Sequence, residues 1–310
     1  MIVTVTLNPA LDKTVVIPDF RAGQVNRVAS SRVDPGGKGV NVSKVLMSLG
    51  EASIAAGLCG GHAGRQLLDG LERLGIPTAF EYGPAETRTN LKITTGPGGE
   101  TTDVNEPGAP VTPQQLQALE ARLDALTGPG EMLVLAGSLP PGVPADYYAG
   151  LTRRQHMRGV RVAVDTSGAP LRQAALAAPD LLKPNLEELE QLTGNHPESD
   201  AAILDACRPL LARGTALVAV TLGGEGAVLV SRGGAWRAQA LPVTVQSTVG
   251  SGDAFTAALA LGLQRGMETE QLLALAAAAG AVNAMTGGTD VPDGAQIRAM
   301  AVRAQLRRLA

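Results

Sequence analysis

Short apolar segments alternate with helical patterns along the whole chain, and this alternation constrains the fold more than any other feature. The apolar segments have the length and composition of buried strands, and they are Ile2–Leu7, Ser53–Leu58, Met132–Ala136, Arg161–Asp165, Leu181–Lys183 and Leu217–Thr221. Helical patterns occupy Val40–Leu49, Gly64–Leu74, Pro113–Leu126, Ala145–Met157, Ala201–Arg213, Ala254–Gln264, Thr269–Met285 and Ala295–Leu309. Because parallel sheets need helical crossovers on their faces, the pattern predicts one α/β domain over residues 1–310, with a mainly parallel sheet between helices.

Two stretches, at about residues 13–34 and 87–105, interrupt the alternation. They contain short alternating segments separated by turn residues, namely Thr14–Ile17, Val25–Arg32, Asn90–Thr94 and Glu100–Val104. These segments predict a small antiparallel sheet inserted into the α/β body. Since a few strands bury little surface by themselves, we expect this sheet to cover a cleft as a lid or to contact a partner subunit.

Composition excludes several classes of function. The net charge of −3 and the 2% aromatic content argue against nucleic-acid binding, which needs basic surfaces and stacking platforms. Cys59 and Cys207 match no metal-binding spacing, and His62, His156 and His196 are scattered along the chain. We therefore expect free, buried thiols and neither a histidine-based metal site nor a histidine-based triad.

No segment is predicted to enter a membrane. Met1–Val5 reads as a strand and lacks a basic region followed by a long apolar run. The most apolar stretch, Leu272–Met285, is half alanine, contains Asn283 and is short for a span, so a packed helix is expected. These features predict a cytoplasmic protein.

The segment Ser247–Phe255 carries the strongest chemical signal. Gly250, Ser251 and Gly252 precede an apolar helical run, and the start of a helix offers unpaired N–H groups to an anion such as a phosphate. Asp253 would repel a phosphate that merely binds there, but it suits a site where a hydroxyl loses a proton and attacks phosphorus. The alternative is that Asp253 is only a helix N-cap, and the segment by itself leaves both interpretations open.

A second glycine-rich segment, Gly36–Ser43, opens another predicted helix. It is not a Walker A loop, because Gly39 stands where a serine or threonine would follow the lysine. The chain also lacks a G-x-G-x-x-G between a strand and a helix, which argues against a dehydrogenase. We interpret the segment as a close approach of backbone to a polar ligand that Lys38 and Asn41 reach. A tight turn with a solvated lysine is the alternative.

Single polar residues add weaker signals. Asp12 follows the first strand and has the chemistry to accept hydrogen bonds from sugar hydroxyls, although a surface acid at a strand end is equally consistent. Arg88 is either a surface charge or a planar fork for a phosphate.

Two further loops follow predicted strands. In Lys183–Glu188, Asn185 and Glu188 have the oxygen ligands that hydrated Mg²⁺ prefers, but the segment by itself favours an N-cap with its third-position glutamate. In Thr221–Ala227, the glycines suit a nucleotide lying flat on backbone, and a simple hairpin turn is the alternative.

Together these segments resemble the ribokinase-like (PfkB) family of carbohydrate kinases over the whole length and in the same order. The two family signatures correspond to Gly36–Ser43 and Ser247–Ala258. The segments Thr6–Asp12, Asp34–Val42 and Thr102–Gly108 resemble the branch that acts on sugar phosphates, which includes 1-phosphofructokinases and tagatose-6-phosphate kinases. The resemblance implies a ribokinase-like three-layer α/β/α sandwich with an inserted β-sheet lid that often also forms a dimer contact.

The resemblance also implies roles for residues at matching positions. Asp253 matches the catalytic base, and Gly250, Ser251 and Gly252 match the anion hole. The positions that match sugar-phosphate contacts are Asp12, Gly37, Lys38 and Asn41, with Arg88 and Ser138 nearby. The positions that match the ATP and Mg²⁺ region are Lys183, Asn185, Glu188, Thr221, Gly223, Gly224, Gly226 and Asn283, with Asn185 and Glu188 holding Mg²⁺ through water. A monovalent cation beside the anion hole is left open.

Three departures from the family pattern stand in this sequence. Ser247 and Ser251 replace the aspartate and alanine that are common in the second signature, and their small side chains preserve the loop shape. Where some fructose-6-phosphate kinases of the family carry a lysine after the glycine corresponding to Gly23, this chain has Gln24, with Arg27 the nearest base.

The resemblance implies ATP-dependent phosphorylation of a ketohexose monophosphate. Fructose 1-phosphate is the expected acceptor, with fructose 1,6-bisphosphate and ADP as products. Tagatose 6-phosphate and fructose 6-phosphate are the alternative acceptors. A non-catalytic nucleotide or sugar sensor on the same fold is the remaining alternative, and the intact glycine loop and Asp253 argue against it.

Overall fold

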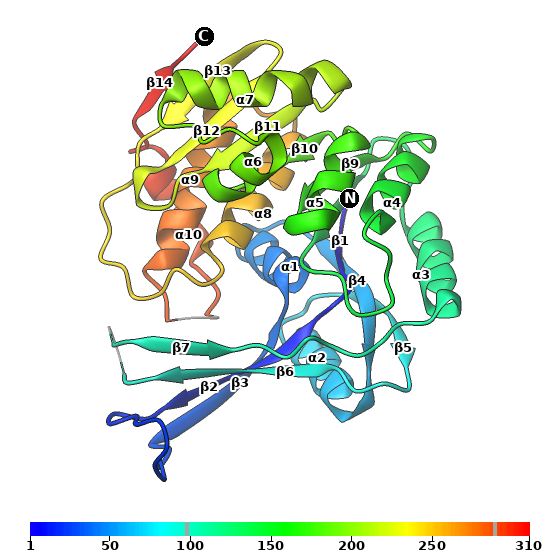
Figure 1. Ribbon diagram of the computed structural model, residues 1–310, viewed down its shortest axis with the longest axis vertical. Helices are drawn as coiled ribbons and strands as arrows, with labels where there is room; N and C mark the ends of the chain where they lie inside the picture. Colours follow the sequence, from blue (N-terminus) through cyan, green and yellow to red (C-terminus); the bar gives the residue numbers. More distant parts are fainter. Residues whose placement is uncertain (97–98, 288–289) are drawn as a thin grey trace.

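A computed structural model describes residues 1–96, 99–287 and 290–310. Its body is a ten-stranded sheet in the order β14-β13-β12-β11-β10-β9-β8-β1-β4-β5 (Figure 1). The strands are β1 (Ile2–Thr6), β4 (Ser53–Gly60), β5 (Thr78–Gly83), β8 (Met132–Ala136), β9 (Arg161–Asp165), β10 (Leu181–Leu182), β11 (Leu217–Thr221), β12 (Ala227–Ser231), β13 (Gly234–Ala238) and β14 (Leu306–Arg308). From β5 to β11 all neighbours pair parallel, and the edge from β11 to β14 is antiparallel.

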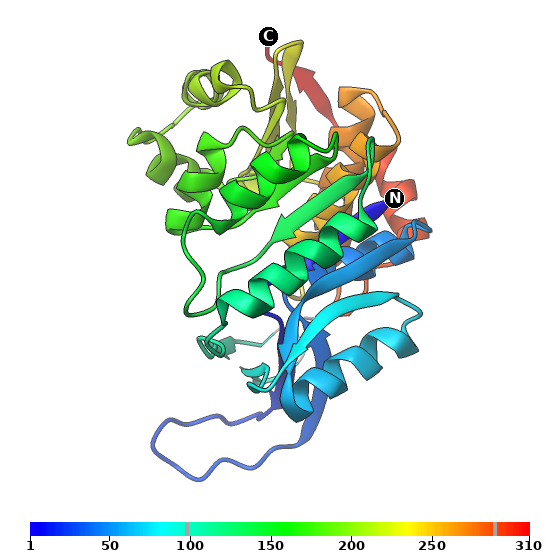
Figure 2. The same cartoon turned by 90° about the vertical axis from the view of Figure 1, so that its right-hand side faces the viewer.

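Helices cover both faces of this sheet, so the predicted three-layer architecture is confirmed (Figure 2). One face carries α1 (Lys38–Ser48), α2 (Gly61–Arg73), α8 (Ser251–Gln264), α9 (Thr269–Ala284) and α10 (Gly294–Ala301). The other carries α3 (Pro113–Leu126), α4 (Tyr147–His156), α5 (Gly168–Leu176), α6 (Leu186–Thr193) and α7 (Asp200–Arg213). Because both faces are covered, the central strands are buried throughout: every residue of β1 and β8 is inaccessible to solvent or nearly so.

A separate four-stranded sheet extends from the body at the bottom of Figure 1, in the order β3-β2-β6-β7. Its strands are β2 (Ala10–Val16), β3 (Ser30–Gly36), β6 (Arg88–Thr94) and β7 (Thr101–Val104). The expectation of an antiparallel sheet is wrong at its centre, because β2 and β6 pair in parallel while the two outer pairs are antiparallel. This follows from the chain path: β2 and β6 both leave the carboxyl ends of body strands, β1 and β5, and therefore run the same way. Residues 97 and 98 of the predicted insertion lie outside the described residues.

The antiparallel edge differs most from the sequence expectation. The predicted helix Ala295–Leu309 is wrong in its second half, because α10 ends at Ala301 and Leu306–Arg308 forms β14 against β13. Strands β5, β12 and β13 and helix α5 were not predicted. The sequence Leu306-Arg307-Arg308 has no strand pattern of its own, and its conformation depends on the neighbour with which it pairs.

Connections at the carboxyl ends of the parallel strands place polar loops at one edge of the sheet, which is where open α/β sheets bind ligands. The strand β1 leads directly into the small sheet there, and β9 ends at Asp165. Among the helices of the described chain, none combines the length and the apolar character needed to cross a membrane.

Candidate active site

The start of α8 forms the glycine loop that the sequence singled out. Gly250 is the N-cap, in the left-handed conformation with φ 81°, and no side chain caps the helix. Asp253 lies in the first helical turn, so the alternative that it is only the N-cap is wrong. The first amides of a helix lack intrahelical partners. Here the Ser251 N–H donates to the Thr248 carbonyl at 3.2 Å, and the amides of Gly250 and Gly252 lie beside it at the start of the helix that carries the Asp253 carboxylate. This arrangement can bind an anion and places a carboxylate base next to it.

The Asp253 carboxylate is buried, with 7% of the residue exposed, and Asn41 Nδ2 donates to its Oδ2 at 2.8 Å. Burial raises the pKa of Asp253 to about 6, against the opposing charge of Lys38. A carboxylate with such a pKa is ionised near neutral pH yet more basic than a solvated one. It therefore suits proton acceptance from a hydroxyl.

Asp165 forms ion pairs with two lysines near the Asp253 carboxylate. Its side chain is fully buried at the end of β9, Lys38 Nζ donates to Oδ1 at 2.9 Å, and Lys183 Nζ lies 3.3 Å from Oδ2. Thr256 Oγ1, one turn into α8, donates to Oδ2 at 2.7 Å. Burial alone would raise the pKa of Asp165, but Lys183 and Lys38 outweigh it and lower the pKa. The Asp165 charge in turn raises the pKa of Lys38.

Sequence reasoning gave Asp165 no role, although it stands in one of the polar loops at the strand ends. Its signal was available: a carboxylate directly after a buried apolar strand is costly unless it is paired. What the sequence could not supply were its partners, Lys38 and Lys183, which lie far away along the chain and meet it only in the folded structure.

The glycine-lysine segment stands at the head of α1, as predicted. Gly37 is the N-cap with φ 110°, and a Cβ there would lie 2.8 Å from Thr6 Cγ2 and 3.1 Å from the Pro9 Cα. Only glycine fits this approach between the loop and the end of β1. The turn brings Lys38 and Asn41 toward Asp165 and Asp253. Lys38 keeps 40% of its side chain exposed, but it is paired with the buried Asp165 and is therefore not the free lysine of a simple tight turn.

Asp12 contributes to the site from the small sheet. It lies within β2, is 5% exposed, and accepts a hydrogen bond from Asn90 Nδ2 at 3.0 Å, with Lys92 Nζ 3.9 Å from its other oxygen. The alternative of a surface acid at a strand end is therefore wrong. Its partners sit on the neighbouring strand β6, where sequence reasoning assigned no role to Asn90 or Lys92.

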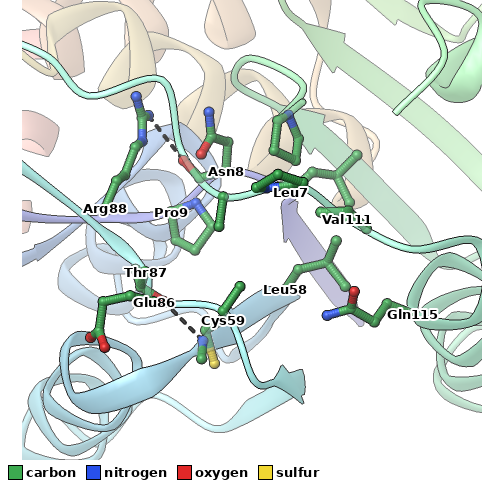
Figure 3. A pocket seen from close by; sticks show the side chains of 15 residues that line it. Leu7, Asn8, Pro9, Leu58, Cys59, Glu86, Thr87, Arg88, Val111 and Gln115 are labelled. Carbon is green, nitrogen blue, oxygen red and sulfur yellow. Dashed lines mark hydrogen bonds between the residues drawn. The ribbon is translucent and has the colours of Figure 1, made fainter. Parts of the chain in front are cut away.

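Arg88 and Ser138 meet through Asn8. The Asn8 side chain donates from Nδ2 to Ser138 Oγ at 3.2 Å, and its backbone carbonyl accepts from Arg88 Nη2 at 3.0 Å. Arg88 Nη1 also donates to the Glu106 carbonyl at 2.7 Å. Figure 3 shows the Arg88–Asn8 contact above a pocket lined by apolar side chains such as Leu58 and Val111. Arg88 is thus held by the backbone and is not a free surface charge.

Asn185 and Glu188 begin α6 with a capping box. Asn185 Oδ1 accepts from the Glu188 N–H at 2.7 Å, and Glu188 Oε2 accepts from the Asn185 N–H at 2.8 Å. The capping interpretation is confirmed. Glu188 nevertheless faces the site closely enough that its charge raises the pKa of Lys38. Within the described chain no group of three or more His, Cys, Asp or Glu residues could hold a metal, so an ion here would keep several waters or phosphate oxygens as ligands.

The loop after β11 turns the chain from β11 into antiparallel β12. A short 3₁₀ turn, Gly223–Glu225, and Gly226 with φ 98° make this connection, so the hairpin interpretation is confirmed. A Cβ added at Gly223 or Gly224 would meet no atom within 4 Å, so the space beside these two residues is open. The Thr221 N–H donates to the Pro184 carbonyl at 3.1 Å, which places this loop beside the start of α6.

Asn283 supports the glycine loop from α9. Its Nδ2 donates to the Val249 carbonyl at 2.8 Å, and the residue is 4% exposed. The predicted site residues therefore form a continuous set around the strand ends. It runs from the small sheet through Asp253 and Asp165 to Lys183 and the loop after β11.

Comparison with known proteins gives a consistent result. A family model described as pfkB family carbohydrate kinase matches residues 5–294. A 1-phosphofructokinase of Rhodobacter capsulatus is 41% identical over 280 residues, covering 89% of this chain and 88% of that protein. A 1-phosphofructokinase of Escherichia coli strain K12 is 34% identical and covers 99% of this chain and 98% of its own length.

Solved structures agree in fold. Phosphofructokinase-2 from Escherichia coli in complex with fructose-6-phosphate superposes with a TM-score of 0.92 at 28% identity, covering 97% of this chain and 98% of that one. A ribokinase from Thermotoga maritima has a TM-score of 0.78 at 21% identity, covers 97% and 98% of the two chains, and indicates the shared fold alone.

Proposed function

Because the chain belongs to the pfkB family of carbohydrate kinases, we propose that it transfers the γ-phosphoryl group of ATP to the C6 hydroxyl of fructose 1-phosphate. The products are fructose 1,6-bisphosphate and ADP. The observation that carries the proposal is the buried Asp253 carboxylate, with its raised pKa, beside the amides at the start of α8. The resemblance to this family that the sequence predicted is confirmed, and the relatives support the choice of fructose 1-phosphate.

In this mechanism Asp253 acts as the general base. Its carboxylate accepts the proton of the attacking hydroxyl, the sugar oxygen bonds to phosphorus, and the bond from phosphorus to the bridging oxygen of ADP breaks. The backbone N–H groups of Gly250, Ser251 and Gly252 stabilise the negative charge on the transferred group, which is the main catalytic contribution in such reactions. Asn41 orients the Asp253 carboxylate through its 2.8 Å hydrogen bond.

Asp12 and Asn41 bind ring hydroxyls of the sugar, and Lys38, Arg88 and Ser138 lie toward its phosphate. The small sheet acts as a lid that keeps water away from the phosphoryl group. Its buried Asp12, already oriented by Asn90, supports this assignment.

The nucleotide lies along the loops at Thr221–Gly226 and Gly250–Gly252, with Lys183 and Asn283 near the phosphates. Asn185 and Glu188 fit Mg²⁺ through water, because both offer oxygen atoms at the edge of the site and few protein ligands are needed. When bound, the ion neutralises charge on the phosphate oxygens.

A coupled ADP-release assay tests the proposal. The panel contains fructose 1-phosphate, fructose 6-phosphate, tagatose 6-phosphate and fructose, each at equal concentration. Highest kcat/KM with fructose 1-phosphate supports it, and a preference for another sugar phosphate contradicts the substrate assignment. No sugar-dependent ADP release with any acceptor would favour a sensor.

Tagatose 6-phosphate and fructose 6-phosphate remain the competing acceptors. Fructofuranose carries a CH₂ group at each end, at C1 and C6. A site that binds the phosphate at one end therefore places the hydroxyl of the other end near Asp253, whichever monophosphate is bound. The Escherichia coli phosphofructokinase-2 was solved with fructose-6-phosphate and, separately, with potassium. Running the panel in potassium and in sodium chloride therefore also tests for a monovalent cation beside the anion hole.

We also propose that two copies pair through the small sheet. The outer strands expose Val33 and Val104, and the adjoining loop exposes Phe20, Val25 and Val28. Light scattering coupled to size exclusion tests this, because Val33→Asp with Val104→Asp should convert a dimer to a monomer. A wild-type monomer at assay concentrations would contradict it.

A further inference from the structure

Asn8 lies where three segments of the chain meet. It belongs to the connector between β1 and β2, and its residue is 7% exposed. Its Nδ2 donates to the Pro107 carbonyl at 3.0 Å and to Ser138 Oγ at 3.2 Å. The first contact reaches the segment that returns from the small sheet to α3, and the second reaches the loop after β8. One amide therefore ties the small sheet to two strand ends of the body.

The neighbouring backbone is shaped to this side chain. Gly108 has φ 93°, and a Cβ there would lie 2.2 Å from Asn8 Oδ1. Glycine at this position lets the returning segment pass directly over the amide. The contact therefore depends on two residues: Gly108, which lets the returning segment come close, and Asn8, whose buried amide donates the hydrogen bond.

The same residue also determines where Arg88 lies. The Asn8 carbonyl accepts from Arg88 Nη2 at 3.0 Å, and the Glu106 carbonyl, one residue before Pro107, accepts from Nη1 at 2.7 Å. Figure 3 shows the Arg88 guanidinium beside the Asn8 carbonyl. Both acceptors of the guanidinium therefore sit on backbone that the Asn8 side chain links together.

We propose that Asn8 is a positioning residue for sugar-phosphate binding, which holds Arg88 and Ser138 at the spacing that the acceptor requires. It does not touch the reacting atoms itself. An arginine recognises a phosphate through the fixed geometry of its fork, so a small displacement of either anchoring carbonyl weakens binding. The nucleotide half of the site has no hydrogen bond to the Asn8 side chain among the contacts above, and its function should be preserved.

The inference rests on the proposed function, and the test separates the two. Asn8→Ala removes both donated hydrogen bonds, and Asn8→Asp keeps the shape but repels the Pro107 carbonyl. Both should raise KM for fructose 1-phosphate about tenfold, roughly the loss of one or two neutral hydrogen bonds. The KM for ATP should stay within twofold, and the thermal midpoint should show that each variant is folded.

Gln155→Ala is the matched control. The Gln155 amide is also buried, donates from Nε2 to Asp124 Oδ1 at 2.8 Å and accepts from Thr127 Oγ1 at 3.0 Å, but it lies in α4, so two hydrogen bonds of a buried amide are lost without touching Asn8 or Arg88. Its KM for the sugar phosphate should match wild type. An unchanged KM in Asn8→Ala, or a parallel rise in KM for ATP and the sugar, overturns the inference. Failure of the proposed substrate would instead appear in the wild-type enzyme.

Discussion

The two halves of the site are built differently. Around α8, charged groups lock one another in place: Asp165 holds Lys38 and Lys183, and Asn41 holds Asp253. Toward the small sheet, Arg88 is held by backbone carbonyls on separate segments. Changing one buried charge disturbs its partners strongly, whereas a chain connector can shift by small steps. The phosphoryl-transfer half is therefore expected to tolerate little change. In the sugar half the same holds for Asp12, which is buried beside Lys92, whereas the backbone-held Arg88 can be repositioned for a different acceptor.

Asp253→Asn is expected to have the largest effect. Asparagine has nearly the same shape as aspartate and can still contact Asn41, but it cannot accept a proton. The value of kcat should therefore fall by about 10³-fold or more. Nucleotide binding, measured by titration calorimetry with ADP, should persist because the glycine loop is intact. Turnover close to wild type would contradict the assignment of the base.

Asp165→Asn tests the interlocked charges. It leaves the buried Lys183 ammonium without its carboxylate, and unfolding free energy should fall by about 3 kcal/mol, measured by chemical denaturation. The Asp165 charge also raises the pKa of Asp253, so its loss should move the acid limb of the kcat/KM profile to lower pH.

Asp180→Asn provides the matched control for that variant. Asp180 accepts from the Val162 N–H at 2.7 Å and pairs with His156, at the start of β10 and away from the strand ends that form the site. It should lose stability without shifting the pH profile. If both variants shift the profile equally, Asp165 has no special link to Asp253.

The pH dependence of the wild-type enzyme should report the same group. Asp253 must be ionised to accept a proton, and its pKa of about 6 lies above the ordinary value. As pH falls through 6 the carboxylate of the free enzyme becomes protonated, so kcat/KM for fructose 1-phosphate should drop about tenfold per pH unit below that point. Initial rates between pH 5 and 8 at subsaturating fructose 1-phosphate measure this. A rate that stays flat down to pH 5 would contradict the raised pKa.

More of the phosphoryl-transfer half than of the sugar half could be predicted from the sequence. The glycine loop, Asp253, Lys38 and Asn41 were predictable because each lies in a short segment whose residue types have a chemical meaning by themselves. The alternation of strands and helices likewise predicted the layers. Local signals suffice where the residue types of one short segment already indicate the chemistry, even though Lys38 and Asn41 meet Asp165 and Asp253 only in the folded chain.

Long-range partners were not predictable in this way. Asp165 meets its lysines, and Asn8 meets Pro107 and Ser138, only because sheet order places distant segments side by side. The same reason explains β14, which has no strand signal and exists through its pairing with β13. Tertiary contacts overrode local propensity there.

The smallest expected effect concerns the nucleotide loop after β11. Arg237, only 17% exposed, donates to the Glu225 carbonyl at 2.9 Å and to Asp200 Oδ1 at 2.7 Å, and so fastens the loop to α7. Arg307 binds the other oxygen of Asp200 at 2.5 Å, but its side chain is 65% exposed. Arg237→Gln should raise KM for ATP about fivefold, the loss of about one hydrogen bond, with KM for the sugar phosphate unchanged. Arg307→Gln should leave both values unchanged. If both variants raise KM for ATP equally in steady-state kinetics, nucleotide binding depends on the ion pairs with Asp200 and not on the hydrogen bond from Arg237 to the Glu225 carbonyl.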